Sequence, residues 1–184
     1  NVDTNFVEIP NIGLANVAFS AVSWVDYDND NDLDVFTCGS DAIGNPVSNL
    51  YSNMGGVLNT SPNPPSNLSA NLNGSQIVFT WDKGNDSQTP ADGLSYDLYV
   101  YDNVHEKYLV YPHSKLSNGN RLISNVGSIL WRSGGYAVNI TTQSNFSWGV
   151  QAIDAAFKAS VVVAGPELIH NCEASYTALV EGLN

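Results

Sequence analysis

The sequence predicts an all-β protein made of two units. Short runs rich in β-branched and aromatic residues recur along the chain, turn residues separate them, and a helical period is nearly absent. With 184 residues, the chain is long enough for one large domain or two small ones. The polar, proline-rich segment 59–65 indicates a linker, so we expect a β unit over 1–58 and a second unit from residue 66 onward.

An acidic stretch lies between two β-patterned runs, 21–25 and 35–37. Carboxylates at alternate positions repel one another strongly unless a cation gathers them. Calcium takes six to eight oxygen ligands, and a D-x-D-x-D loop bends so that alternate side chains converge on one ion. The stretch therefore predicts a Ca2+ loop with these residues: Asp26, Asp28, Asp30, Asp32 and Asp34.

The spacing assigns a role to each aspartate of the predicted loop. Asp26, Asp28 and Asp30 would supply the first, third and fifth ligands. The backbone carbonyl of Asp32 would be the seventh ligand and Asp34 the ninth. We expect the side-chain carboxylate of Asp32 to point outward, into solvent.

The residues at two positions distinguish this loop from the calcium loop of an EF-hand. The sixth position, where glycine is common, holds Asn31, which tolerates a positive φ better than most residues. The twelfth position holds Thr37 in place of glutamate, and the flanking runs have strand patterns, so the loop is no EF-hand. The alternatives are a solvated acidic turn, or magnesium, which resists dehydration and favours a stricter octahedron.

The segments 22–36 and 49–56 together resemble one VCBS/FG-GAP repeat. Such repeats form β-propellers, and the resemblance implies a four-stranded blade with its calcium loop between the first two strands. The segment 5–9 resembles the last strand of a blade. A single unit of this kind cannot bury its own apolar faces, since about three or more stacked units normally make a continuous core. We therefore expect other chain segments, the second unit or other subunits to cover it.

The second unit carries seven β-patterned runs with turn signals between them, which predict an antiparallel sandwich over 66–166. The runs are 68–72, 76–81, 95–101, 107–111, 136–142, 146–153 and 160–163. Segments 64–70, 77–81, 94–100 and 146–154 resemble a fibronectin type III domain.

That resemblance implies a core position for Trp81, and core positions for Phe146 and Trp148 on the penultimate strand. Phe146 stands where tyrosine is frequent, and the connection over 112–135 is longer than usual. The tail, 167–184, is apolar enough to dock as a strand or a short helix.

The charge excludes some partners. Lysine and arginine total 6 against 18 acidic residues, for a net charge of −12, so neither nucleic acid nor an anionic membrane surface is an expected partner. No apolar run has the length needed to cross a bilayer, and the first residues lack the features of a targeting signal. The missing initiator methionine indicates a processed chain or part of a longer one. Because calcium is most available outside cells, we expect an extracellular or cell-surface location.

Two cysteines, Cys38 and Cys172, lie far apart in the sequence. They are candidates for a disulfide that would hold the tail against the first unit. The alternative is two independent buried thiols. Their spacing does not fit a zinc site.

These features favour binding and assembly over catalysis. No catalytic motif occurs, and His105, His113 and His170 are scattered, so we do not expect an enzyme. We expect a calcium-stabilised extracellular structural or adhesion module, which associates with itself or with other surface proteins. The most specific form of this hypothesis is a filament subunit that assembles by strand complementation.

The alternative function is a carbohydrate-binding accessory module that stacks glycans on exposed aromatic rings. The candidate platform comprises Tyr99, Tyr101, Tyr108, Tyr111 and Trp131. The competing interpretation is that these are ordinary strand residues with one face in the sandwich. The N-x-Ser/Thr sequons of the chain reflect its asparagine-rich and serine-rich composition.

Overall fold

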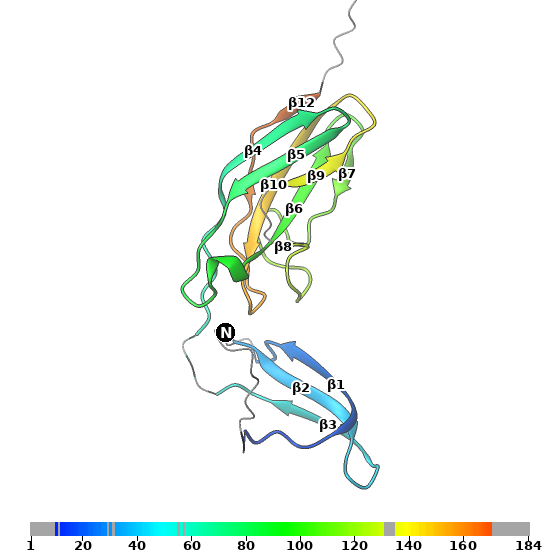
Figure 1. Ribbon diagram of the computed structural model, residues 1–184, viewed down its shortest axis with the longest axis vertical. Coiled ribbons are helices and arrows are strands. Elements are labelled where there is room, and N and C mark those ends of the chain that lie inside the picture. Colours follow the sequence, from blue (N-terminus) through cyan, green and yellow to red (C-terminus); the bar gives the residue numbers. More distant parts are fainter. Residues whose placement is uncertain are drawn as a thin grey trace, which may run out of the picture. The chain divides into compact units, whose positions relative to one another are not determined.

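The computed structural model describes residues 10, 12–28, 30, 32–54, 56, 58–130 and 135–170. The chain divides into two compact units, Asn1–Asn59 and Thr60–Asn184, which we describe separately (Figure 1). Apart from one short 3-10 helix, Ala91–Gly93, the regular elements of the described residues are strands, and the predicted all-β class is confirmed. No helix in the described part of the chain has the length and apolarity that crossing a membrane requires.

The N-terminal unit contains one antiparallel sheet of three strands in the order β1-β2-β3. The strands are β1 (Ala18–Val25), β2 (Asp34–Ser40) and β3 (Pro46–Tyr51). The acidic loop connects β1 to β2, and its ends meet where Val25 pairs with Asp34. A tighter turn joins β2 to β3, in which Asp41 accepts hydrogen bonds from the backbone N–H groups of Ile43 and Asn45. Both runs that flank the acidic stretch are strands, as predicted.

No described side chain of the N-terminal unit belongs to the buried apolar core. Its apolar side chains are instead exposed on both faces of the sheet. Alternate positions of a strand share a face, so Val22 and Trp24 lie together on one face. Phe36 and Leu50 are cross-strand partners on the other face and are also exposed. The sheet therefore lacks the burial that an isolated three-stranded sheet needs for stability.

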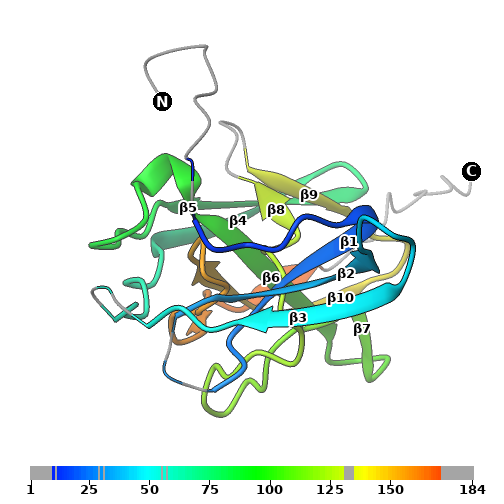
Figure 2. The same cartoon turned by 90° about the horizontal axis from the view of Figure 1, so that it is seen from below.

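The C-terminal unit is a β-sandwich of two antiparallel sheets (Figures 1 and 2). One sheet contains β4 (Ser66–Asn73), β5 (Gln76–Asp82) and β9 (Tyr136–Asn139). The other follows the order β11-β10-β6-β7, and β8 pairs with β6 while β12 pairs with β10. Its strands are β6 (Ser95–Asp102), β7 (Lys107–Val110), β8 (Ile129–Leu130), β10 (Ser144–Ile153), β11 (Val163–Ala164) and β12 (Leu168–His170).

Alternate residues of β5, β6 and β10 fill the space between the two sheets. The main contributors are Ile77, Phe79, Trp81, Tyr96, Leu98, Val100, Phe146, Trp148, Val150 and Ala152. The ring of Trp148 lies 4.8 Å from that of Phe79, and its indole N–H donates to the carbonyl of Pro166 at 2.7 Å. The core positions predicted for Trp81, Phe146 and Trp148 are confirmed by their burial.

The described parts of the predicted linker and of the predicted tail both form hydrogen bonds with the sandwich. In the linker, the backbone N–H of Asn63 donates to the carbonyl of Asn85 at 2.8 Å. The start of the tail forms the strand β12, which pairs with residues Ser144 to Phe146 of β10. A strand was one of the two alternatives predicted for the tail. Residues 171–184 and Trp131 lie outside the described residues.

The long connection over 112–128 is the main departure from the predicted strand pattern. It crosses the outer face of the six-stranded sheet, where two buried polar residues hold it. Gln151 accepts a hydrogen bond from the Ser114 hydroxyl at 2.6 Å and donates to the carbonyl of Gly119 at 2.6 Å. Asp97 accepts from the backbone N–H of Ser128 at 2.8 Å. The short strand β8 follows, and the sequence pattern did not predict it.

Candidate metal centre

Three aspartates of the acidic loop converge at the end of the β1–β2 hairpin. Asp26, Asp28 and Asp34 each place one carboxylate oxygen so that the three atoms lie within 4.8 Å of one another. Oxygens bound to one calcium at 2.3–2.6 Å lie at most about 5 Å apart. The triad can therefore hold a metal ion. Asp26 and Asp28 come from the loop, while Asp34 is the first residue of β2.

Asp34 anchors the loop to the end of the sheet. Its carboxylate is fully buried and accepts two backbone hydrogen bonds at 2.8 Å, from the N–H groups of Tyr27 and Asn53. The bonds from Asn53 and Tyr27 lower the pKa of Asp34, and they outweigh the opposing effect of burial. Asp34 is therefore anionic at neutral pH, and its carboxylate has further lone pairs that can accept a cation.

Asp28 links the loop to the segment that follows β3. It accepts a hydrogen bond from the Ser52 hydroxyl at 3.1 Å and one from the backbone N–H of Asp30 at 3.3 Å. Sequence reasoning assigned no role to Ser52 or Asn53. Both lie in the segment 49–56 that carried the family resemblance, but neither residue type suggests a ligand, so only that location pointed to them.

Asp30 and Asp32 are not part of the converging triad. Asp30 accepts a hydrogen bond from the backbone N–H of Asp32 at 3.0 Å. The expectation that the Asp32 carboxylate points into solvent is wrong for one of its oxygens, because Oδ1 is shielded and has no hydrogen-bond partner in the described structure. Burial, followed by the charges of Asp30, Asp34 and Asp28, raises the pKa of Asp32. The protein itself therefore leaves part of the repulsion between these carboxylates uncompensated.

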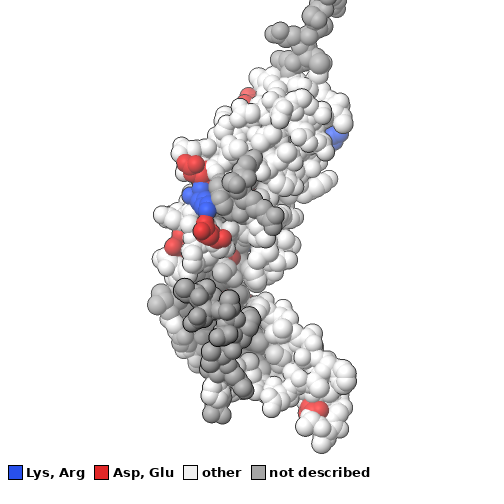
Figure 3. All heavy atoms as spheres, viewed as in Figure 1, with Lys and Arg blue, Asp and Glu red and all other residues white. Residues whose placement is uncertain are grey.

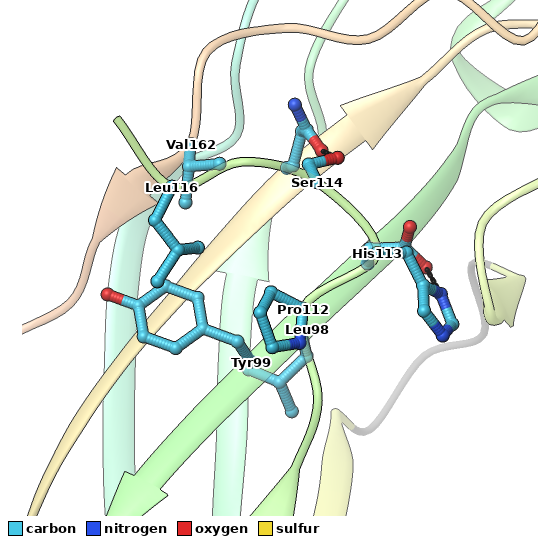
Figure 4. A pocket seen from close by; sticks show the side chains of 9 residues that line it. Leu98, Tyr99, Pro112, His113, Ser114, Leu116 and Val162 are labelled. Atoms are coloured by element: carbon cyan, nitrogen blue, oxygen red, sulfur yellow. Dashed lines mark hydrogen bonds and ion pairs between the residues drawn. The ribbon is translucent and has the colours of Figure 1, made fainter. Parts of the chain in front are cut away.

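A second polar cluster lies in the sandwich, around Asp97. Figure 4 labels one member of this cluster, His113. Nδ1 of His113 lies 3.3 Å from Oδ1 of Asp97 and 3.2 Å from Oγ of Ser128. A catalytic Asp-His-Ser relay needs the acid and the hydroxyl on opposite ring nitrogens. Here the same nitrogen contacts both, so the arrangement does not form that relay. Arg121 also pairs with Asp97, at 2.6 Å, and the cluster holds the 112–128 connection on the sheet.

Of the two cysteines, Cys38 belongs to the described residues. Cys38 lies half-buried on β2. Cys172 lies outside the described residues, so the pairing of Cys38 with Cys172 stays a prediction.

Comparison of the chain with protein-family models gives no match, and comparison with curated proteins gives none either.

Proposed function

We propose that this chain is a calcium-stabilised extracellular structural or adhesion module that assembles with other subunits or chain segments. The observation that carries the proposal is the convergence of Asp26, Asp28 and Asp34 at the end of a sheet whose described side chains form no buried apolar core. In this proposal the N-terminal unit is one VCBS/FG-GAP-like blade element and the C-terminal unit is a fibronectin type III-like sandwich.

Calcium suits this donor set better than other common metals. The triad offers only carboxylate oxygens, which are the ligands of hard cations, and no imidazole or thiolate joins them among the described residues. Calcium accepts irregular sets of six to eight oxygens and lets water complete the shell, whereas magnesium requires a near-ideal octahedron. The backbone carbonyl of Asp32 and the side chain of Asp30 are the further ligands that we propose.

The proposed role of the ion is structural. Asp28 and Asp34 already hydrogen-bond to Ser52 and Asn53, which follow β3. A cation bound to the triad would therefore hold together the β1–β2 loop and the segment after β3. It would also neutralise the carboxylates that raise the pKa of Asp32. A ligand that binds only the folded state stabilises that state by mass action.

We expect calcium to raise the stability of the N-terminal unit by about 2.7 kcal/mol when its free concentration is 100 times the dissociation constant. Trp24 is the only tryptophan of residues 1–59, so the difference in fluorescence between the wild type and Trp24→Phe reports on this unit during denaturant unfolding. Asp28→Asn should weaken calcium binding at least about tenfold, measured by titration calorimetry, because it removes one anionic ligand. Terbium luminescence sensitised by Tyr27 provides a second readout.

Asp92→Asn is the matched control for the charge change. Asp92 is 89% exposed in its side chain and lies in the C-terminal unit, so its removal should leave calcium affinity unchanged. Unfolding curves that coincide in calcium and in chelator would refute the calcium site. Magnesium binding as tightly as calcium would refute the assignment of the metal.

The uncovered faces of the N-terminal sheet support assembly. Among the described residues, β1 and β3 are its two edges and carry unpaired backbone groups, which are templates for strand addition. Trp24 is 53% exposed on β1, and its neighbour Val22 lies on the same face. We propose that another sheet of the same kind, from a second copy of the chain or an adjoining chain segment, covers this face.

Charge placed on this face should prevent assembly. We expect oligomers of the wild type in calcium by size-exclusion chromatography with light scattering, and monomers for Trp24→Lys. Ile43→Lys is the control, because Ile43 is 84% exposed in the β2–β3 turn, away from the sheet faces. A compact monomer of the wild type both in calcium and in chelator would contradict self-assembly.

A further inference from the structure

A row of tyrosines lies on the outer face of the six-stranded sheet. Tyr99 and Tyr101 alternate on β6 with the core residues Leu98 and Val100, so their side chains point away from the core. Tyr101 pairs with Tyr108 of β7, and their rings lie 4.9 Å apart at 63°.

Tyr111 extends the row beyond β7. Its ring lies 5.3 Å from that of Tyr108, and its side chain is among the most exposed large apolar groups of this unit, at 70%. These ring contacts hold the row in place without burying its outer surface. The row includes four of the five aromatic residues that the sequence indicated as a platform, and the fifth, Trp131, lies outside the described residues.

The ring of Tyr99 reaches over the neighbouring strand β10, where a glycine leaves room for it. Gly149 of β10 is its cross-strand partner, and a Cβ at that position would lie 2.7 Å from Cε1 of the tyrosine ring. The ring therefore occupies the space that a side chain at position 149 would need. In Figure 4 the ring also borders Pro112 and Leu116 of the long connection, which fix its position.

A polar groove of about 490 Å³ adjoins Tyr99 on this outer face. Its walls include Asn103, Asn145, Ser147 and Glu167. Asn103 donates to the Ser147 hydroxyl at 3.0 Å, and Asn145 donates to Glu167 at 2.9 Å. These side chains hold one another in place, so their remaining donors and acceptors are preorganised for a ligand. The volume lies within the usual range for small-molecule sites.

We propose that this face binds a neutral oligosaccharide. Sugar rings present both apolar C–H surfaces and hydroxyl groups. The rings of the tyrosine row stack on the C–H surfaces, while the amide, hydroxyl and carboxylate groups of the groove hydrogen-bond to the hydroxyl groups of the sugar. Among the described residues that line the groove there is no lysine or arginine, and the one charged residue is Glu167, so these residues do not favour a phosphate or a sulfate.

The charged residues of this unit support the choice of a neutral ligand. On the face drawn in Figure 3, lysine and arginine atoms form no broad patch among the described residues. With a net charge of −12, the chain repels polyanions, which disfavours nucleic acid as the stacked ligand. A proline-rich peptide is the other occupant that a tyrosine-lined surface accepts, and it enters the test as the competing outcome.

The test uses the full chain and titration calorimetry with soluble cellohexaose, xylohexaose and mannohexaose as probes. We expect one of them to bind and Tyr111→Ala to weaken that binding about tenfold, as the loss of one stacked ring predicts. Ser147→Ala tests the polar wall and should also weaken binding. Tyr136→Ala is the control, because Tyr136 is an exposed tyrosine on β9 of the other sheet and its removal should change nothing.

The outcomes are distinct from those of the calcium test, since the groove lies in the C-terminal unit and the acidic loop lies in the N-terminal unit. Each titration is made in calcium and in chelator, and sugar binding should be equal in both. Two-dimensional NMR with a labelled chain checks that Tyr111→Ala remains folded and that the shifted resonances lie on β6 and β10. Absence of binding by all three sugars at millimolar concentration overturns the proposal, and so does binding of a polyproline decamer alone. Binding that Tyr111→Ala and Ser147→Ala leave unchanged overturns the location.

Discussion

Replacing Trp148 by alanine should destabilise the C-terminal unit by about 3–5 kcal/mol, the range for aromatic deletions in packed cores. Trp148 is almost completely buried, packs on Phe79 and donates to the Pro166 carbonyl. Gly165 also passes so close to the indole that even a Cβ at this position would collide with it. The truncated side chain would therefore leave a cavity between the sheets and an acceptor without its donor. Urea unfolding followed by far-ultraviolet circular dichroism measures the loss.

Trp148→Phe separates the two contributions. It keeps an aromatic ring against Phe79 and loses the indole N–H and part of the volume, so it should cost less than the alanine variant, about 1–3 kcal/mol. A loss below about 1 kcal/mol for Trp148→Ala would contradict the packing of the two sheets on this residue.

Arg121→Ala should cost about 3 kcal/mol, because it removes one partner of a buried ion pair and leaves the other charge without compensation. The side chains of Arg121 and Asp97 are 8% and 7% exposed. Arg121 also donates to the carbonyls of Ile123 and Asn125, so the variant should loosen the long connection as well. Urea unfolding measures the stability, and amide exchange of residues 112–128 should become faster.

The acid dependence of this pair has a definite sign. Burial raises the pKa of Asp97, but the hydrogen bonds from Ser128 and Arg121 and the charge of Arg121 outweigh it, and the net pKa is lowered. The contribution of Asp97 to stability is therefore present above the ordinary aspartate pKa of about 3.9 and is lost as the pH falls through the lower folded-state value. In Arg121→Ala this acid-induced loss should shrink.

Asp92→Asn is again the control, since it breaks the exposed pair of Lys83 with Asp92. Such surface pairs contribute at most about 1 kcal/mol. If Arg121→Ala were as mild as this control, or if acid destabilised both proteins equally below pH 4, the buried pair would not hold the connection in the way described.

Local pattern was sufficient for most of the strands. In β5, alternate residues from Ile77 to Trp81 are buried. In β10 the core residues from Phe146 to Ala152 also lie at alternate positions, although every residue from Trp148 onward is buried. A period of two in apolar residues specifies a strand with one face in a core, whichever strand lies beside it. The acidic loop is also local, because its ligands come from one short stretch and their spacing alone suggests a shared cation.

The predictions were less accurate wherever a residue depends on a distant part of the chain. Asp34 receives its second hydrogen bond from Asn53, and Asp28 receives one from Ser52, after two further strands. The roles of Asp97 and Gln151 in holding the 112–128 connection were not foreseen, since a polar residue in a strand pattern normally indicates a solvent-facing position. Asp97 bonds to Arg121 and Ser128, and Gln151 bonds to Gly119. In each of these pairs the two residues are 24–32 positions apart in the sequence.

The amino-acid order alone thus established the β class, the strand positions and the aspartates that can meet one cation, because each follows from repeats of a few neighbouring residues. The folded arrangement was needed to show which three carboxylates converge, that the described side chains of the N-terminal sheet form no apolar core, and that Tyr99 lies on Gly149 beside a polar groove. These properties depend on which strands become neighbours and in which register. Chain segments far apart in sequence set that pairing through the burial and hydrogen bonds they gain together.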